Sequence, residues 1–311
     1  ESIGEIIKAV ESVSPEIIIE TNFVRSGYRR SGKLVGVEPS FFNISDFHLN
    51  KGKMFNEHHT YWGDQVCIIG HGVKISKGQK YLRKIIDKYK IPFALTWNAS
   101  DLIESSHPSY VGRPGAFAER GSNFIVQNCN LYVSVGTRLP FMVTGYNSKG
   151  FARNAKKIMV DIDKIEINRS NVNLDEKINC DASYFLKSLL KYLPNKINLS
   201  KNWLKYCKNV RKKYPIVLEK FKTQKKFVNS YYFIDVLSDV LNNKDIIVTD
   251  MGLSFVGTHQ AFRIKKGQKL YTNSGHAPMG WGLPAAVGAC YASKKHRIIC
   301  LTGEGGLHGD L

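Results

Sequence analysis

The stretch that decides the fold runs from residue 271 to residue 306 and reads YTNSGHAPMGWGLPAAVGACYASKKHRIICLTGEGG. A segment rich in Gly, Pro and Ala leads into an apolar strand run, Ile298 to Leu301. A tight turn then carries a carboxylate, Glu304, between glycines. A strand that ends in such a turn can offer backbone N–H groups to a phosphate and a carboxylate oxygen to a divalent cation.

Upstream of this stretch, strand and helix patterns alternate along the chain from residue 66 to residue 254. Apolar strand runs occupy residues 66–70, 92–96, 131–135 and 158–162, and a helix of period 3.6 spans 77–90. A further helix pattern at 231–241 precedes a strand at 245–249 and a polar turn at 250–254. Alternation at this spacing predicts parallel sheets with right-handed crossovers, and therefore α/β, doubly wound domains.

Two segments differ from this pattern. Residues 1–69 alternate polar and aromatic residues around Gly turns, with strand runs at 16–22 and 33–37, which predicts a small α+β segment. Residues 193–228 are rich in Lys and helical by pattern, which predicts a linker. The remaining boundaries are then 70–192 for one α/β domain and 229–311 for the other.

The net charge of +19 invites a nucleic-acid interpretation. The lysines are spread through every segment and form no patch interleaved with aromatic residues, so compositional bias is the favoured explanation and no nucleic-acid partner is expected. No run of 18 apolar residues and no signal peptide are found. Six cysteines without a CxxC pair predict reduced, mostly buried thiols in a cytoplasmic protein.

The glycines at Gly70 and Gly72 are a weak dinucleotide signal. The third glycine is not at the expected place, and no acidic residue follows about 20 positions later. A tight turn from strand to helix is the favoured interpretation.

Several motifs, taken in order, resemble thiamine-diphosphate (ThDP) enzymes of the acetolactate-synthase group. They are YVGRPG at 110–115, FIVQN at 124–128, SVGTRL at 134–139, MVDID at 159–163, SGHAPMGWGLPAAVGA at 274–289 and the GEGG turn at 303–306. The resemblance covers residues 66–311 and implies a central domain followed by a diphosphate-binding domain. It implies decarboxylation of a 2-keto acid with C–C bond formation. It leaves open whether the central domain carries FAD.

The resemblance also implies roles for individual residues. Met279 would hold the cofactor in its bent conformation, the backbone of Ala277 would accept a hydrogen bond from the aminopyrimidine, and Glu304 would bind Mg²⁺ where the family usually has Asp. The diphosphate contacts would be Gly252, Leu253, Ser254, Gly303, Gly305 and Gly306. Leu253 and Ser254 depart from the Gln-His that is common in the family, which leaves backbone donors and one hydroxyl there.

The family activates its cofactor with a glutamate of a separate pyrimidine-binding domain, and no residue here matches that motif. No catalytic residue is therefore assigned, and the chain is expected to be inactive alone. A pyrimidine-domain-bearing chain or a homo-oligomer would complete the site. The chain stops at Leu311, so we expect a truncated diphosphate domain whose second metal ligand lies further downstream.

Residues 1–69 resemble something different, the periplasmic core domain of MacB-type ABC-transporter permeases. The matching string is VGVEPSFFNISDFHLNKGKMFNEHH, followed by GDQVCIIG. The two resemblances meet at residues 66–70, which suggests a chimera. Two alternatives follow: an extracytoplasmic transport module, with a membrane as partner, or a non-catalytic protein with the ThDP-enzyme fold.

Overall fold

The structure is a computed structural model that describes residues 16–25, 28–37 and 63–309, apart from residues 196, 198, 294 and 295. For the first two ranges, the backbone alone is described. The chain divides into two compact units, Glu1–Gly63 and Asp64–Leu311.

The N-terminal unit contains a hairpin of two antiparallel strands, β1 (Glu16–Arg25) and β2 (Tyr28–Val37). The pairing runs from Glu16 opposite Val37 to Arg25 opposite Tyr28. Both strands predicted from the sequence are confirmed. Most of the string that resembles the MacB-type domain lies at 38–62, outside the described residues, so that resemblance remains a prediction.

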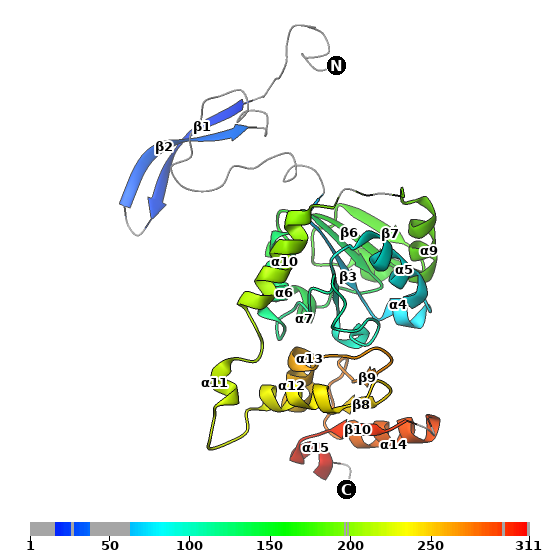
Figure 1. The fold of residues 1–311 in the computed structure, drawn as a ribbon. Coiled ribbons are helices and arrows are strands. Elements are labelled where there is room, and N and C mark those ends of the chain that lie inside the picture. Colours follow the sequence, from blue (N-terminus) through cyan, green and yellow to red (C-terminus); the bar gives the residue numbers. More distant parts are fainter. Residues whose placement is uncertain are drawn as a thin grey trace. The chain divides into compact units, whose positions relative to one another are not determined.

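The larger unit begins with a sheet of five parallel strands in the order β4-β3-β5-β6-β7 (Figure 1). Its strands are β3 (Gln65–Ile69), β4 (Phe93–Leu95), β5 (Leu131–Val135), β6 (Lys156–Asp161) and β7 (Glu176–Asn179). The order reverses between β3 and β5, as in a doubly wound fold, and the predicted parallel α/β domain is confirmed.

Helices cover both faces of this sheet, and each face has its own apolar core (Figure 1). One face carries α4 (Gly72–Ile75), α5 (Gln79–Tyr89) and α9 (Ala182–Tyr192), and the other carries α6 (Arg120–Asn128) and α10 (Lys201–Lys213). Short helices complete the domain: η1 (Trp97–Ala99), α7 (Phe141–Thr144), η2 (Ser148–Gly150) and α8 (Lys164–Asn168).

Helix α10 belongs structurally to this domain, although its sequence reads as part of a linker. Trp203 is buried in the core beside α6, and its indole N–H donates to the Gln65 carbonyl at 2.9 Å. Cys207 and Val210 lie in the same core. The apolar side of a Lys-rich helix thus packs on the sheet, while Lys205, Lys208, Lys212 and Lys213 are exposed.

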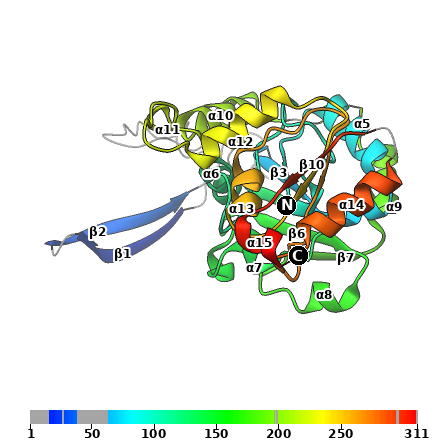
Figure 2. The same cartoon turned by 90° about the horizontal axis from the view of Figure 1, so that it is seen from below.

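A second parallel sheet has the order β10-β8-β9, with β8 (Ile246–Thr249), β9 (Lys269–Tyr271) and β10 (Ile298–Leu301). Helices α12 (Ser230–Val240) and α13 (Leu253–Ala261) contribute to the core on one face, and α14 (Gly282–Ala292) to the core on the other. In Figure 2, β10 runs between α13 and α14. The short helix α11 (Glu219–Lys222) precedes α12.

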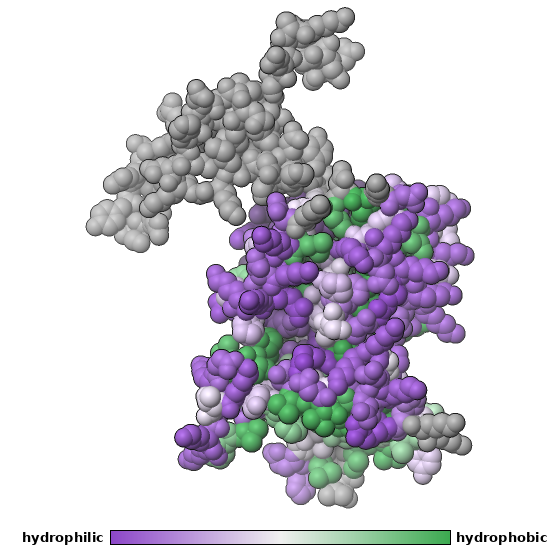
Figure 3. Space-filling model, in the orientation of Figure 1, coloured by the Kyte–Doolittle hydropathy of each residue, from purple (hydrophilic) through white to green (hydrophobic). Residues whose placement is uncertain are grey.

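One local prediction needs correction. Glu304 lies in no tight turn, because it is the first residue of a short helix, α15 (Glu304–His308). On α12, the apolar residues Phe233, Val236 and Val240 are exposed, while Ile234 is buried. The hydropathy view shows apolar side chains gathered over this helix (Figure 3). The core side of α12 is therefore narrower than its apolar pattern suggests.

All six cysteines are free, as predicted. Only Cys129 and Cys207 are buried, whereas Cys290 is exposed and the other three are half-buried, so the expectation of mostly buried thiols is wrong. Across the part of the chain that the structure describes, no helix has both the length and the apolar character needed to cross a membrane.

Candidate functional site

The predicted site residues lie on three loops that leave one edge of the second sheet. Because β8, β9 and β10 are parallel, their carboxyl ends meet at the same edge, which is where open α/β sheets bind ligands. The loop after β8 carries Gly252, the loop after β9 carries Ala277 and Met279, and β10 leads to Gly303. Asp250 and Thr302, which are 52 positions apart in the sequence, are thereby brought together.

A buried carboxylate, Asp250, holds the three loops together. Its side-chain oxygen Oδ2 accepts hydrogen bonds from the backbone N–H of Gly280 at 3.1 Å and from the Thr302 hydroxyl at 3.0 Å. Asp250 itself is 1% exposed, and its other oxygen, Oδ1, has no hydrogen-bond partner in the described structure. In the sequence, Asp250 is marked only as the first residue of a polar turn, directly after a buried strand.

The glycines beside Asp250 leave no room for a side chain. A Cβ atom on Gly282 would lie 2.7 Å from the Asp250 Cβ, and one on Gly306 would lie 1.8 Å from Oδ2. Both glycines are buried. The Gly-rich composition of the stretch therefore serves the close approach of α14 and α15 to this carboxylate.

The turn after β8 has the geometry of an anion site. Gly252 has φ = 77°, a left-handed conformation that favours glycine, and no atom lies within 4 Å of its ideal Cβ position. It caps α13, whose first N–H groups have no partner within the helix. Leu253 is exposed, and the Ser254 hydroxyl donates to the Met251 carbonyl at 2.8 Å. Backbone donors and the Ser254 oxygen are thus the groups that this turn can offer.

The loop after β9 carries a strained residue at the predicted position. Ala277 has φ = 53°, which is uncommon for a residue with a Cβ, and its N–H donates to the Asn273 carbonyl at 3.0 Å. Met279 is 72% exposed, although large apolar side chains are normally buried. Its sulfur lies 3.6 Å from the ideal Cβ position of Gly305. An exposed Met on a strained loop, facing a glycine-lined helix start, suits contact with a ligand.

The predicted metal ligand, Glu304, is exposed at the start of α15, and Gly303 and Gly305 on either side of it are exposed as well. Among the described residues, no group of three or more His, Cys, Asp and Glu side chains could enclose a metal ion. Mg²⁺ is commonly held by one or two carboxylates together with phosphate oxygens and water. The donor set therefore fits a metal that is shared with a diphosphate, and does not form an all-protein cage.

At the corresponding edge of the five-stranded sheet, two loops pack closely against each other. Gly70 and Gly72 form the turn from β3 to α4, and the Gly72 N–H donates to the Gly136 carbonyl at 2.9 Å. A Cβ on Gly70 would lie 2.1 Å from the Gly136 oxygen. These glycines let two loops pack against each other, and the predicted tight turn is confirmed.

Comparisons with known proteins agree with this geometry. Residues 64–189 match the family described as thiamine pyrophosphate enzyme, central domain, and residues 250–309 match its C-terminal TPP binding domain. The second match spans the turn after β8, the Gly-rich loop and α15.

Several individual relatives are named as large subunits of acetolactate synthase. The chain is 30% identical over 255 residues to a probable acetolactate synthase large subunit of Methanococcus aeolicus, covering 78% of this chain and 42% of that protein. It is 32% identical over 248 residues to the corresponding protein of Methanocaldococcus jannaschii, covering 78% and 41%. For acetolactate synthase isozyme 1 large subunit of Escherichia coli K12, identity is 26% over 242 residues, covering 78% and 42%.

The chain thus spans about two fifths of the length of the curated relatives that it matches. The matched residues include the five-stranded sheet, strands β9 and β10 of the second sheet and the three loops around Asp250. Because it matches both the central domain and the C-terminal TPP binding domain, the chain belongs to the thiamine pyrophosphate enzyme family.

Proposed function

We propose that the three loops around Asp250 bind thiamine diphosphate together with Mg²⁺, as part of an acetolactate synthase-like enzyme that acts on 2-keto acids. The observation that carries this proposal is the convergence of the loops. A single buried carboxylate joins the backbone of Gly280 to Thr302, and the open turn at Gly252 lies directly beyond it.

The roles of the residues follow from their positions. The first N–H groups of α13 and the exposed backbone at Gly303 and Gly305 donate to the diphosphate. Glu304 would hold Mg²⁺ through a carboxylate oxygen, together with the diphosphate. Met279 supports the organic part of the cofactor, and the carbonyl of Ala277 accepts a hydrogen bond from it.

When bound, thiamine diphosphate supplies carbanion chemistry at a carbon that attacks the keto group of the substrate. The residues of this chain position the diphosphate end of the cofactor. The group that activates the cofactor belongs, in this proposal, to a pyrimidine-binding domain elsewhere, on another segment or another subunit. The relatives are named large subunits, which supports an assembly of more than one chain.

Isothermal titration of the purified chain with thiamine diphosphate, with and without Mg²⁺, tests the proposal. Binding should require Mg²⁺, and Glu304→Gln should weaken it about tenfold or more, as expected when a charged metal ligand is lost. Glu219→Gln is the matched control, because Glu219 is an exposed glutamate of α11 and belongs to none of the three loops. Equal affinity for Glu304→Gln and the wild type would remove Glu304 from the metal site.

A further inference from the structure

Helix α13 has one end at the proposed cofactor site and the other at a buried arginine of the preceding domain. The helix begins at Leu253, beside the open turn, and ends at Ala261. Nine residues of α-helix make a rod about 13 Å long. A displacement at the far end therefore moves the first turn of the helix with it.

Arg113 binds the backbone carbonyls at the C-terminal end of α13. Its guanidinium donates to the carbonyl of His259 at 2.7 Å, to that of Phe262 at 2.6 Å and to that of Thr258 at 3.4 Å. Arg113 is 3% exposed. The last carbonyls of a helix have no partner within the helix and carry its partial negative charge, so a buried cation satisfies both their hydrogen bonding and their field.

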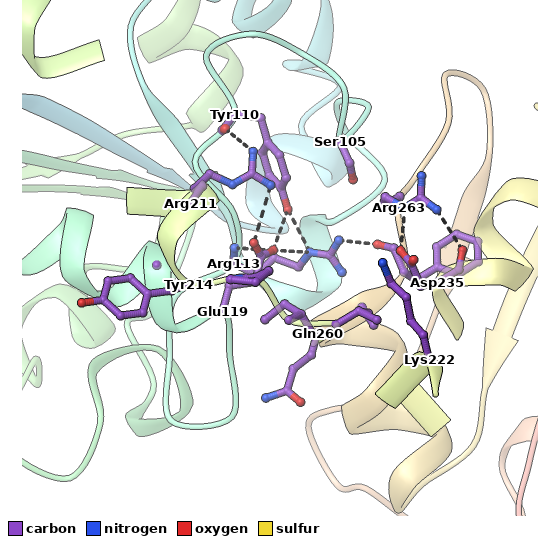
Figure 4. A pocket seen from close by; sticks show the side chains of 16 residues that line it. Ser105, Tyr110, Arg113, Glu119, Arg211, Tyr214, Lys222, Asp235, Gln260 and Arg263 are labelled. Carbon is purple, nitrogen blue, oxygen red and sulfur yellow. Dashed lines mark hydrogen bonds and ion pairs between the residues drawn. The ribbon is translucent and has the colours of Figure 1, made fainter. Parts of the chain in front are cut away.

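The charge of Arg113 is balanced inside the preceding domain (Figure 4). Its Nε donates to the Tyr110 hydroxyl at 2.9 Å and lies 3.7 Å from a carboxylate oxygen of Glu119. Glu119 also accepts from the Arg113 backbone N–H at 3.2 Å and lies 3.7 Å from Arg211. The close-up shows this cluster on one wall of a cavity of about 300 Å³, with Asp235 and Arg263 on the other.

An aromatic contact fixes the side of the same helix. The Trp97 ring meets Phe255 at 4.8 Å and stacks on His259 at 5.5 Å. His259 is fully buried, and burial together with the nearby charge of Arg113 holds its pKa well below the usual value, so the ring is neutral. One residue further along the chain from Trp97, Asn98 accepts a hydrogen bond from Ser274 of the loop after β9 at 2.8 Å.

We infer that Arg113 is a positioning residue for the cofactor site. Its contacts with α13 fix the position of the backbone N–H groups in the Gly252–Ser254 turn. The inference rests on the proposed function, because the turn is taken to hold the diphosphate. Arg113 touches no part of that site itself. Coupling of this kind is reciprocal, so diphosphate binding at the start of α13 also strengthens the contact at its end.

The test compares Arg113→Met, Arg113→Lys and the double variant Arg113→Met/Glu119→Gln, which removes the Glu119 charge together with that of Arg113 and is used if the single variant folds poorly. Arg263→Met is the control, since Arg263 lines the same cavity but pairs with Asp235 and Asp239 instead of the carbonyls of α13. Affinities for thiamine diphosphate and for inorganic pyrophosphate are measured with Mg²⁺ on folded protein. Hydrogen exchange is followed at residues 253–257 and, for comparison, along β8.

We expect both affinities to fall about tenfold when Arg113 is replaced by Met, a size typical of a partly buried cation at a helix C-terminus. Arg113→Lys should recover part of the loss, and Arg263→Met should lose none. Amide exchange at 253–257 should become faster relative to β8. A lower unfolding temperature with unchanged affinities and unchanged exchange at 253–257 would show a merely structural role and overturn the inference.

Failure of the proposed function has a different signature. If the wild type binds neither thiamine diphosphate nor pyrophosphate, the proposed cofactor site is wrong, and the exchange measurement alone decides the role of Arg113. Faster exchange at 253–257 in Arg113→Met then still supports its control of the first turn of α13. Unchanged exchange overturns it.

Discussion

Replacing Asp250 with Ala tests how strongly one carboxylate holds the site together. The change removes the acceptor of the Gly280 N–H, and a hydrogen bond to a charged acceptor contributes about 1.5–3 kcal/mol. The Thr302 hydroxyl loses less, because it also lies 3.1 Å from the Gly303 carbonyl. Relief from burying the unpaired oxygen Oδ1 offsets part of the loss. We expect a net decrease of about 2 kcal/mol in the free energy of unfolding.

Asp250→Asn is the matched variant. The amide oxygen can take the place of Oδ2 and keep both donors, while the amide nitrogen stands where Oδ1 already lacks a partner. We expect a decrease of less than about 1 kcal/mol, because one acceptor is retained and the buried charge is removed.

Urea unfolding of the full chain, followed by circular dichroism, measures both variants, and thermal unfolding supports it. A loss of about 2 kcal/mol corresponds to a midpoint lowered by about 4–8 °C for a folded unit of this size. Titration with thiamine diphosphate should show weaker binding for Asp250→Ala than for Asp250→Asn. The reasoning is refuted if Ala is tolerated within about 0.5 kcal/mol, or if Asn costs as much as Ala.

Three further outcomes are expected. Gly306→Ala should lower the free energy of unfolding by about 1–3 kcal/mol, because its Cβ would lie 1.8 Å from Asp250 Oδ2. Gly288→Ala on α14 has open space around it and should raise the free energy of unfolding by up to about 1 kcal/mol. Urea unfolding measures both variants. The hydrogen bond from Arg83 lowers the pKa of Glu104 to about 2, so the stability that Glu104 contributes is full above its unfolded pKa of roughly 4.3 and is lost as the pH falls through the folded pKa. In Glu104→Gln, the free energy of unfolding should therefore depend less steeply on pH in that acid range. Equal pH dependence in the variant and the wild type would contradict this. Maleimide labelling with mass spectrometry should modify the exposed Cys290 first, while Cys129, whose pKa burial raises to about 12, reacts only on unfolding; early labelling of Cys129 would contradict its burial.

The regular elements could be predicted from local pattern. The apolar runs that became β3, β8 and β10 and the 3.6-residue period of α5 are properties of a few neighbouring residues. On α5 the apolar positions Leu82, Ile85, Ile86 and Tyr89 are buried, as that period requires. The loops after β8 and β10 could be placed at one sheet edge because parallel strands end at the same edge, whereas the short strand β9 was not predicted.

The groups that organise the site could not be predicted in this way. An Asp after a strand is a usual turn residue, and the partners of Asp250 lie 30 and 52 positions further along the chain. Arg113 was recognised only as part of a motif, because its acceptors lie about 145 positions away and are backbone carbonyls that any sequence supplies. Such contacts depend on how two domains meet, which no local pattern encodes.

The pairing of β8 with β10 has a consequence for the order in which the protein is made. Strand β8 leaves the ribosome well before β10, and Asp250 precedes Thr302 by 52 residues. Until β10 has been made, one edge of β8 is unpaired and Asp250 Oδ2 lacks its hydroxyl donor. Parallel pairing across such a separation is slow, and an unpaired apolar edge invites aggregation. Nascent chains that stall between these two residues should therefore depend most on chaperones.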